Sequence, residues 1–491
     1  LPIADGQATI EVTFGGGATS VDVNVANAKQ LPSLHFERDI IPLLTRSGCN
    51  SGGCHGKQSG QAGFKLSVFG HDTPADYAAM VSEGRGRRVF PASSSGSLLL
   101  LKAINRVPHG GGRRIAPESP EYRRLLRWIE GGLPWGDDDT PRVVKIDVLP
   151  RQRVLSERSQ QRLLVTATLS DGSTRDVTSE AAYISNDKAF ATVDPHGRIS
   201  TTSRGGETAI VVRYQEHVAA TLIMVPINSK AAGSTQLANW DRSHFIDRLV
   251  AEKWESLNLS PSSPADDATF LRRVFLDLIG RLPSPAEATG YLSDIRSDKR
   301  VHLVNSLLER PEYADFQALK WADLLRINRT DLGPKPAWTY HQWLRRSFER
   351  NQPYDEFLRE LVTAQGSNHS NGAVNFFRAF DNPNELTVAV SQVFLGVRLD
   401  CAKCHHHPYE KWSQDDFYGL AAFFPRLKNK KGSGGELRFF LADQGDVKHP
   451  QTKEIVLPRV LLGETLSTVV EADARQHLAD WLAEPKNPFV A

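Results

Sequence analysis

The chain has 491 residues, which is more than one core uses and predicts about three domains. Its 59 basic and 57 acidic residues give a net charge of +2, so the overall charge provides no footprint for nucleic acid or an anionic membrane surface. Hydrophobic residues make up 40% and charged residues 24%, a globular composition that excludes global disorder.

Residues 1–30 are predicted to form a β-hairpin. Hydrophobic residues alternate over 8–12 and again over 21–25, with three glycines at 15–17 between them. Because one hairpin cannot bury a core alone, we interpret this segment as the C-terminal strands of an Ig-like or other β domain whose beginning is missing.

Residues 31–140 are predicted to form a small all-α domain. Phe36 and Ile40 recur at helical spacing just ahead of Cys49, and residues 122–129 form a second amphipathic pattern. A helix that leads into a Cys-Cys-His motif, followed by a closing helix, is typical of a c-type cytochrome domain.

Residues 143–228 change from helical to alternating patterns. Residues 163–169 alternate before a Ser-Asp-Gly-Ser turn, and further strands are expected at 189–193 and 209–212. Short strands at regular intervals predict an all-β sandwich. The stretches VTATLSDGSTRDV and GETAIVVRY resemble bacterial Ig-like domains.

Residues 236–491 are predicted to be mainly helical. Ser284 and Glu287 form a capping-box pattern with proline at the first helical position, and Ser413 begins a similar acidic cap. The chain ends at residues 487–491 without a natural stop, so we expect this domain to continue beyond residue 491. The longest apolar stretch, 218–227, is about half the length of a membrane span.

All four cysteines fall in two pairs, each followed by histidine. In a c-type cytochrome two thiols bond to the haem vinyl groups and the adjacent histidine coordinates the iron. Cys401, Cys404 and His405 have the two-residue spacing that this chemistry needs. Cys49 and Cys54 are separated by four residues, and we expect Gly52 and Gly53 to let the extra residues bulge outward.

Two other interpretations of the pairs remain open. The pairs could form local disulfides or a thioredoxin-like redox site. A zinc site is the second alternative, because thiolate and imidazole both suit that metal. Its ligands would be drawn from Cys49, Cys54, Cys401 and Cys404, or from a subset of these with His55, His405 and His407.

The sequence around the motifs resembles a known family. FKLSVFG (64–70), SLLLLKA (97–103) and VPHGGGRR (107–114) are similar to the planctomycete-type cytochrome c domain, whose motif has the same long spacing. Residues 375–424 resemble the helical domain associated with it in large exported proteins. The resemblance implies a di-haem c-type cytochrome with two covalently bound haem c groups and a periplasmic or otherwise extracytoplasmic location.

His55 and His405 are the expected proximal iron ligands. For the distal side of the first haem the candidates are Met80 and His109, and we favour His109 because the three glycines after it permit close approach to a porphyrin. Met80 is expected to pack in a helix core.

The second haem has no methionine near it in the sequence, since Met224 lies in the expected sandwich. His407 is too close to His405 to reach the opposite face, and an open or water-bound iron is the alternative to His341 or His369. Trp412 and Tyr409 are expected to line the haem pocket or to belong to an ordinary aromatic core; both interpretations stay open.

The first functional hypothesis is electron transfer between redox partner proteins or small electron carriers. The second is a haem oxidoreductase with an open distal site, acting in polysaccharide processing or on peroxide. The third is a zinc-binding adhesion or carbohydrate-binding protein that uses the Ig-like domain. No catalytic residue is identified, and no nucleic-acid partner is expected.

Overall fold

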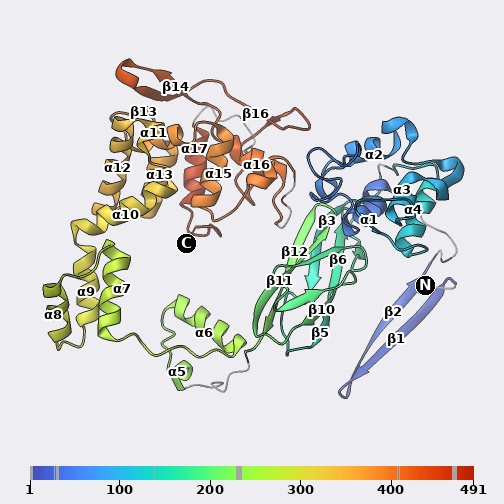
Figure 1. Cartoon of the computed structure of the whole chain (residues 1–491), viewed down its shortest axis with the longest axis horizontal. Coiled ribbons are helices and arrows are strands. Elements are labelled where there is room, and N and C mark those ends of the chain that lie inside the picture. Colours follow the sequence, from blue (N-terminus) through green and yellow to red (C-terminus); the bar gives the residue numbers. More distant parts are fainter. Residues whose placement is uncertain are drawn as a thin grey trace. The chain divides into compact units, whose positions relative to one another are not determined.

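The computed structural model describes residues 4–26, 28, 33–137, 139–227, 235–405, 407, 410–466 and 473–490. The chain divides into two compact units, Leu1–Pro226 and Ile227–Ala491, which are described separately (Figure 1). The first combines β-structure with a small helical domain and the second is mainly helical, so the fold is multidomain and mixed. No helix in the described ranges is long and apolar enough to cross a membrane.

The first unit begins with the expected hairpin. Strands β1 (Gly6–Phe14) and β2 (Gly17–Val25) pair antiparallel over their whole length. The side chains of Ile10, Val12 and Phe14 are all more than half exposed. The hairpin is therefore confirmed, and its apolar side chains face solvent.

A helical domain with its own core follows. A π-helix (Phe36–Ile40) runs directly into α1 (Ile41–Arg46), as the spacing of apolar residues predicts. The remaining helices are α2 (Thr73–Val81), α3 (Leu98–Ala103) and α4 (Pro120–Glu130), with 3-10 turns at Val68–Gly70, Glu83–Gly86 and Pro91–Gly96. Ser119 caps α4 and Trp128 on its inner face is fully buried.

The β-sandwich consists of ten short strands. They are β3 (Val143–Leu149), β4 (Gln152–Val154), β5 (Gln160–Arg162), β6 (Leu164–Leu169), β7 (Thr174–Asp176), β8 (Ala182–Ser185), β9 (Ala191–Val193), β10 (Arg198–Thr201), β11 (Gly206–Tyr214) and β12 (His217–Val225). Their sheets have the orders β4-β12-β11-β8, β3-β6-β7 and β5-β10-β9. Val165, Ile210 and Ile223 are fully buried between the sheets, as alternation along the strands requires.

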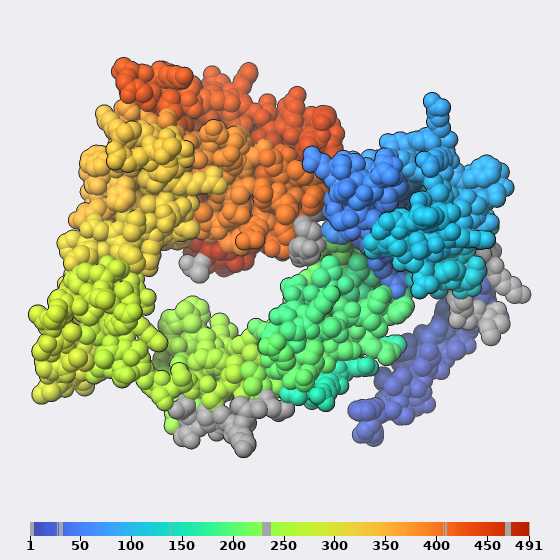
Figure 2. Space-filling model, in the orientation of Figure 1, coloured from blue at the N-terminus to red at the C-terminus, as the bar shows by residue number. Residues whose placement is uncertain are grey.

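The helical domain packs against the sandwich (Figures 1 and 2). Glu180 of the sandwich accepts from Arg175 at 2.6 Å and pairs with Arg124 of α4 at 3.2 Å. Asp39 lies 3.9 Å from Arg175, and the Tyr214 hydroxyl donates to Glu180 at 3.2 Å. Charged groups from both domains therefore form one network across this interface.

The second unit is built from helices with a few short strands. The helices are α5 (Thr235–Ala238), α6 (Phe245–Leu257), α7 (Asp267–Ile279), α8 (Pro285–Ser293), α9 (Lys299–Leu308), α10 (Pro311–Leu324), α11 (Arg329–Leu332), α12 (Pro334–Glu349), α13 (Tyr354–Thr363), α14 (Phe376–Ala379), α15 (Pro383–Val393), α16 (Gln414–Ala421) and α17 (Ala474–Leu482). The strands are β13 (Gly366–Ser367), β14 (Leu427–Lys431), β15 (Leu437–Leu441), β16 (Val447–Lys448) and β17 (Ile455–Val456), and 3-10 turns lie at Ala373–Asn375, Asp400–Lys403 and Ser433–Gly435. The capping boxes at Ser284 and Ser413 are both confirmed.

Helix α15 is shorter than the apolar pattern of its sequence. Apolar residues continue at helical spacing to Val397, whereas α15 ends at Val393 and Gly396 adopts a φ of +64°. The second cysteine motif therefore begins in a short 3-10 turn, Asp400–Lys403, after a loop.

Candidate functional site

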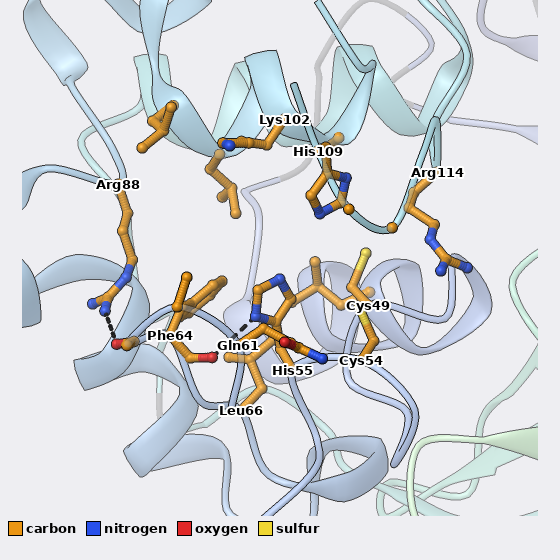
Figure 3. Close-up of a pocket in the computed structure, with 18 of the residues that line it drawn as sticks. Cys49, Cys54, His55, Gln61, Phe64, Leu66, Arg88, Lys102, His109 and Arg114 are labelled. Carbon is orange, nitrogen blue, oxygen red and sulfur yellow. Dashed lines mark hydrogen bonds between the residues drawn. The ribbon is translucent and has the colours of Figure 1, made fainter. Parts of the chain in front are cut away.

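A pocket of about 860 Å³ lies in the helical domain of the first unit (Figure 3). This volume is within the range of cofactor and ligand sites. Its apolar wall consists of Leu44, Leu66, Leu98, Leu99, Ala103, Ile115 and Leu125. The same pocket holds the first cysteine motif and His109.

The motif loop folds back on itself after α1. The amide of Cys49 donates to Leu44 at 2.9 Å, and the amide of His55 donates to the carbonyl of Cys49 at 3.1 Å. The amide of Leu66 in turn donates to the His55 carbonyl at 2.9 Å. These bonds close the long cysteine spacing into a compact turn.

The glycines that this turn requires differ from those expected. Gly52 and Gly53 have open space around them and no left-handed φ. A side chain on Gly56, in contrast, would place its Cβ 2.2 Å from the carbonyl oxygen of Asn50, and Gly48 has a φ of +71°. The turn therefore requires glycine at positions 48 and 56, whereas the exposed Gly52 and Gly53 lie on its outer side in a conformation that does not require glycine.

Two imidazole rings face each other across the pocket. The rings of His55 and His109 lie 6.3 Å apart between centroids with an angle of 9° between their planes. Nδ1 of His55 donates to the Phe64 carbonyl at 3.0 Å, and Nδ1 of His109 donates to the Gly112 carbonyl at 2.8 Å. Because a carbonyl only accepts, Nε2 of each neutral ring carries the free lone pair.

The environment keeps His55 neutral. Burial lowers its pKa, and the charges of nearby groups such as Arg88 lower it further, against the opposing effect of the hydrogen bond to Phe64. His109 is carried by a loop that returns to α3, because the amide of Arg114 donates to the Ala103 carbonyl at 2.8 Å. Both rings are thus held by backbone contacts.

Two thiols stand beside the imidazole pair. Figure 3 shows Cys49 and Cys54 to one side of His55 and His109. Both thiols are free, and burial together with the neighbouring Cys54 raises the pKa of Cys49 to about 12. Cys401 and Cys404 are free as well, so the structure contains neither of the local disulfides considered from the sequence.

The charged lining residues of the pocket are all cationic: Arg87, Arg88, Lys102 and Arg114. Arg88 donates to the Gly63 carbonyl at 2.7 Å and lies 4.6 Å from the centre of the Phe64 ring. No role for these side chains was predicted from the sequence, although the cluster GRGRR at 84–88 was a signal for Arg87 and Arg88.

Met80 does not take part in the pocket. Its side chain is fully buried in the core of the helical domain, and the pocket lining does not include it. Met224 is likewise buried in the sandwich. The structure brings together Cys49, Cys54, His55 and His109 in one place.

The second motif has a different environment. Cys401 and Cys404 are exposed, His405 is half-buried, and His407 is buried with its amide donating to the Trp412 carbonyl at 2.8 Å. Tyr409 and His406 lie outside the described residues.

Trp412 belongs to the hydrophobic core of the second unit. It is 4% exposed, its ring lies 5.9 Å from that of Phe489, and its Nε1 donates to Glu410 at 2.7 Å. Of its two expected roles, core packing is the one for which these contacts provide evidence.

The distal candidates for the second motif, His341 and His369, lie on other segments of the second unit. The His369 amide donates to Ser367 at 3.2 Å, its carbonyl accepts from Thr339, and His341 lies on α12. The ring of His449, for which no role was predicted from the sequence, lies 5.7 Å from the Tyr418 ring between centroids, and the Tyr418 hydroxyl donates to the Lys403 carbonyl within the motif.

His449 is not arranged as an iron ligand. Its Nδ1 accepts from the amides of Gln451 and Thr452, so the ring proton is on Nε2, which lies 3.5 Å from Asp415. Among the described residues as a whole, no three His, Cys, Asp or Glu side chains form a group that could hold a metal ion unaided.

Two comparisons with known proteins bear on this arrangement. Residues 245–429, which include the second motif, match the family described as PSCyt2, protein of unknown function (DUF1549). A stretch of 99 residues, 20% of the chain, is 36% identical to the S-layer-related protein of Niallia circulans. The chain spans about 6% of the length of that relative.

Proposed function

We propose that the chain is an exported di-haem c-type cytochrome that transfers electrons. The observation that carries this proposal is the pair of parallel imidazoles, His55 and His109, beside two free thiols in one pocket. Thioethers at Cys49 and Cys54 would attach the haem, and the two histidines would be its axial ligands. The haem, when bound, supplies one-electron chemistry at iron.

The separation of the rings fits this group. A metal–imidazole bond is about 2 Å long, and the nitrogen lies about 1 Å from the ring centre, so two histidines on opposite faces of one iron place their centroids about 6 Å apart. The 6.3 Å between His55 and His109 agrees with this expectation. Because Nδ1 of each ring donates to a carbonyl, Nε2 of each neutral ring is left as the nitrogen that would bind iron.

The residues that line the pocket would tune the reduction potential of the proposed haem. Hydrogen bonds from Nδ1 to the carbonyls of Phe64 and Gly112 fix each ring and increase its basicity as a ligand. Two histidine ligands favour a lower reduction potential than histidine with methionine. The apolar wall from Leu44 to Leu125 excludes water, while Arg88 and Lys102 provide positive charge for the haem carboxylates.

Cys401, Cys404 and His405 form the second proposed haem site. The support here is the two-residue spacing of the thiols and the match of this region to the PSCyt2 family. Similarity to a protein named S-layer-related supports an extracytoplasmic location, where the expected electron partners are redox proteins or small carriers.

Ligand binding tests this assignment of roles. In the reduced wild type, the first haem should be six-coordinate and should not bind carbon monoxide rapidly. His109→Ala should open the distal side of the first haem and allow it to bind carbon monoxide rapidly. His341→Ala, on α12 of the second unit, is the control and should leave the spectrum of the first haem unchanged. Rapid binding at the first haem in the wild type would contradict His109 ligation and favour the oxidoreductase alternative.

A further inference from the structure

The positive charge of the chain is concentrated around the first pocket. Residues 33–136 contain 14 Lys and Arg against 8 Asp and Glu, a net charge of +6, while the rest of the chain is net −4. Two of the eight carboxylates, Asp39 and Asp76, are buried. The near-neutral total of +2 therefore conceals a strongly basic domain, and overall charge was a misleading guide to partners.

The charges that line the pocket form a cationic rim, defined here as Arg87, Arg88, Lys102 and Arg114. Arg87 and Arg114 are exposed, and their side chains make no hydrogen bond or ion pair with another described residue. Arg88 and Lys102, in contrast, donate to backbone carbonyls. The rim thus has two fixed cations and two that are free to meet an external anion.

The rim extends along the chain segments that form the pocket. Lys65 follows Phe64, Arg85 follows Gly84 and Arg113 precedes Arg114, and all three side chains are exposed. Glu83 is the acidic neighbour at this edge, 3.8 Å from Arg88. Two haem carboxylates would neutralise only part of this charge, so the mouth of the pocket remains positive when it is filled.

We propose that the cationic rim is the docking surface for an acidic electron-carrier protein, which exchanges electrons at the mouth of this pocket. The inference rests on the proposed haem function, because it places the partner where a haem edge would be reached. Complementary charge raises the rate of encounter and orients the partner, and this effect weakens as salt screens it. A haem held by this pocket would supply the single electron that reduces an oxidised partner in each exchange, and a reduced partner would return it.

Electron exchange with small reagents of opposite charge tests the rim. The full-length reduced protein is mixed with hexacyanoferrate(III), an anion, or hexaammineruthenium(III), a cation, from about 10 to 200 mM salt. The rate with the anion should fall as salt rises and the rate with the cation should rise. At low salt, the double variant Arg87→Gln with Arg114→Gln should lower the rate of electron transfer to the anion by about 3- to 10-fold.

A matched double variant provides the control. Arg153→Gln with Arg162→Gln removes the same charge from exposed positions on β4 and β5 of the sandwich, and should change the rate little. Equal effects of the two double variants, or rates independent of salt for both reagents, would overturn the inference.

A second measurement does not need haem. Calorimetry should detect binding of a polyglutamate peptide to the full chain, weakened by the rim variant and unchanged by the sandwich control. Binding of phosphatidylserine vesicles through the same arginines, without polyglutamate binding, would overturn the inference in favour of a membrane surface. A protein that carries no haem but binds polyglutamate would contradict the proposed function and leave acidic docking supported.

Discussion

The guanidinium of Arg213, on β11 of the sandwich, lies 4.7 Å from the centre of the Phe69 ring in the helical domain. The amide of Phe69 donates at 3.1 Å to the carbonyl of Asn50, which lies between Cys49 and Cys54. Arg213 is only 4% exposed. The sandwich therefore contacts the first cysteine motif through one intermediate residue, and we expect it to position that loop.

Replacement of this cation tests the positioning role. Arg213→Gln removes a buried cation–π contact and should destabilise the first unit by about 1–2 kcal/mol. Because the motif loop loses a support, the reduction potential of the first haem should shift as well. Arg153→Gln, an exposed change on the same sandwich, is the control. If the reduction potential of the first haem is unchanged in Arg213→Gln, Arg213 contributes to stability alone and does not position the motif loop.

Asp76 predicts a specific dependence of stability on pH. Burial raises its pKa from 3.8 to about 7, against the hydrogen bonds from Ser67, while the charge of Asp72 raises it further. The folded state thus holds a proton that the unfolded state releases. The stabilising contribution of protonated Asp76 to the free energy of unfolding is therefore complete below about pH 4 and is lost as the pH rises through 7.

Asp76→Asn should remove that dependence. The free energy of unfolding in urea is compared between the variant and wild type at each pH. As the pH rises from 4 to 8, this difference should shift in favour of the variant by on the order of 3 kcal/mol. A constant difference between the two proteins over this range would show that Asp76 titrates normally. Asp72→Asn, at the half-buried N-cap of α2, should retain most of the wild-type pH dependence.

The thiols should differ in reactivity before haem is attached. In haem-free protein at pH 8, iodoacetamide should alkylate exposed Cys401 and Cys404 well before Cys49, because burial raises the pKa of Cys49 to about 12 and the thiolate is the reactive form. Peptide mass spectrometry at successive times measures the order. Alkylation of Cys49 at the rate of Cys401 would contradict the buried position of the first motif.

The proposed distal ligand, His109, should also influence the reduction potential of the first haem. His109→Met should raise the reduction potential of the first haem by on the order of 0.1 V, because a thioether favours ferrous iron more than imidazole does. Potentiometric titration followed by visible spectra measures this change. Met80→Leu, a core substitution away from the pocket lining, should leave the potential unaltered.

The features that the sequence predicted correctly are those encoded locally. The capping box at Ser284 needs only four consecutive residues, and the buried positions of β6 follow from alternation. In the same way, the spacing of Phe36 and Ile40 was sufficient to predict a helix before Cys49.

Features that depend on how the chain folds back on itself could not be predicted from the sequence pattern. The glycine that the motif turn requires, Gly56, is identified only when the chain folds back onto Asn50. The cationic rim collects residues from three segments, so the stretch GRGRR at 84–88 indicated only two of its members and the total charge indicated none. The burial of Trp412 in the core likewise depends on Phe489, 77 positions later.

The most direct test of the central claim is the mass of the denatured protein. Protein matured in a host that attaches haem c should retain two haems covalently after denaturation. Cys49→Ala with Cys54→Ala should retain one, and Cys401→Ala with Cys404→Ala should retain the other. A wild-type protein without covalent haem, or a haem content unchanged by Cys49→Ala with Cys54→Ala, would contradict the account.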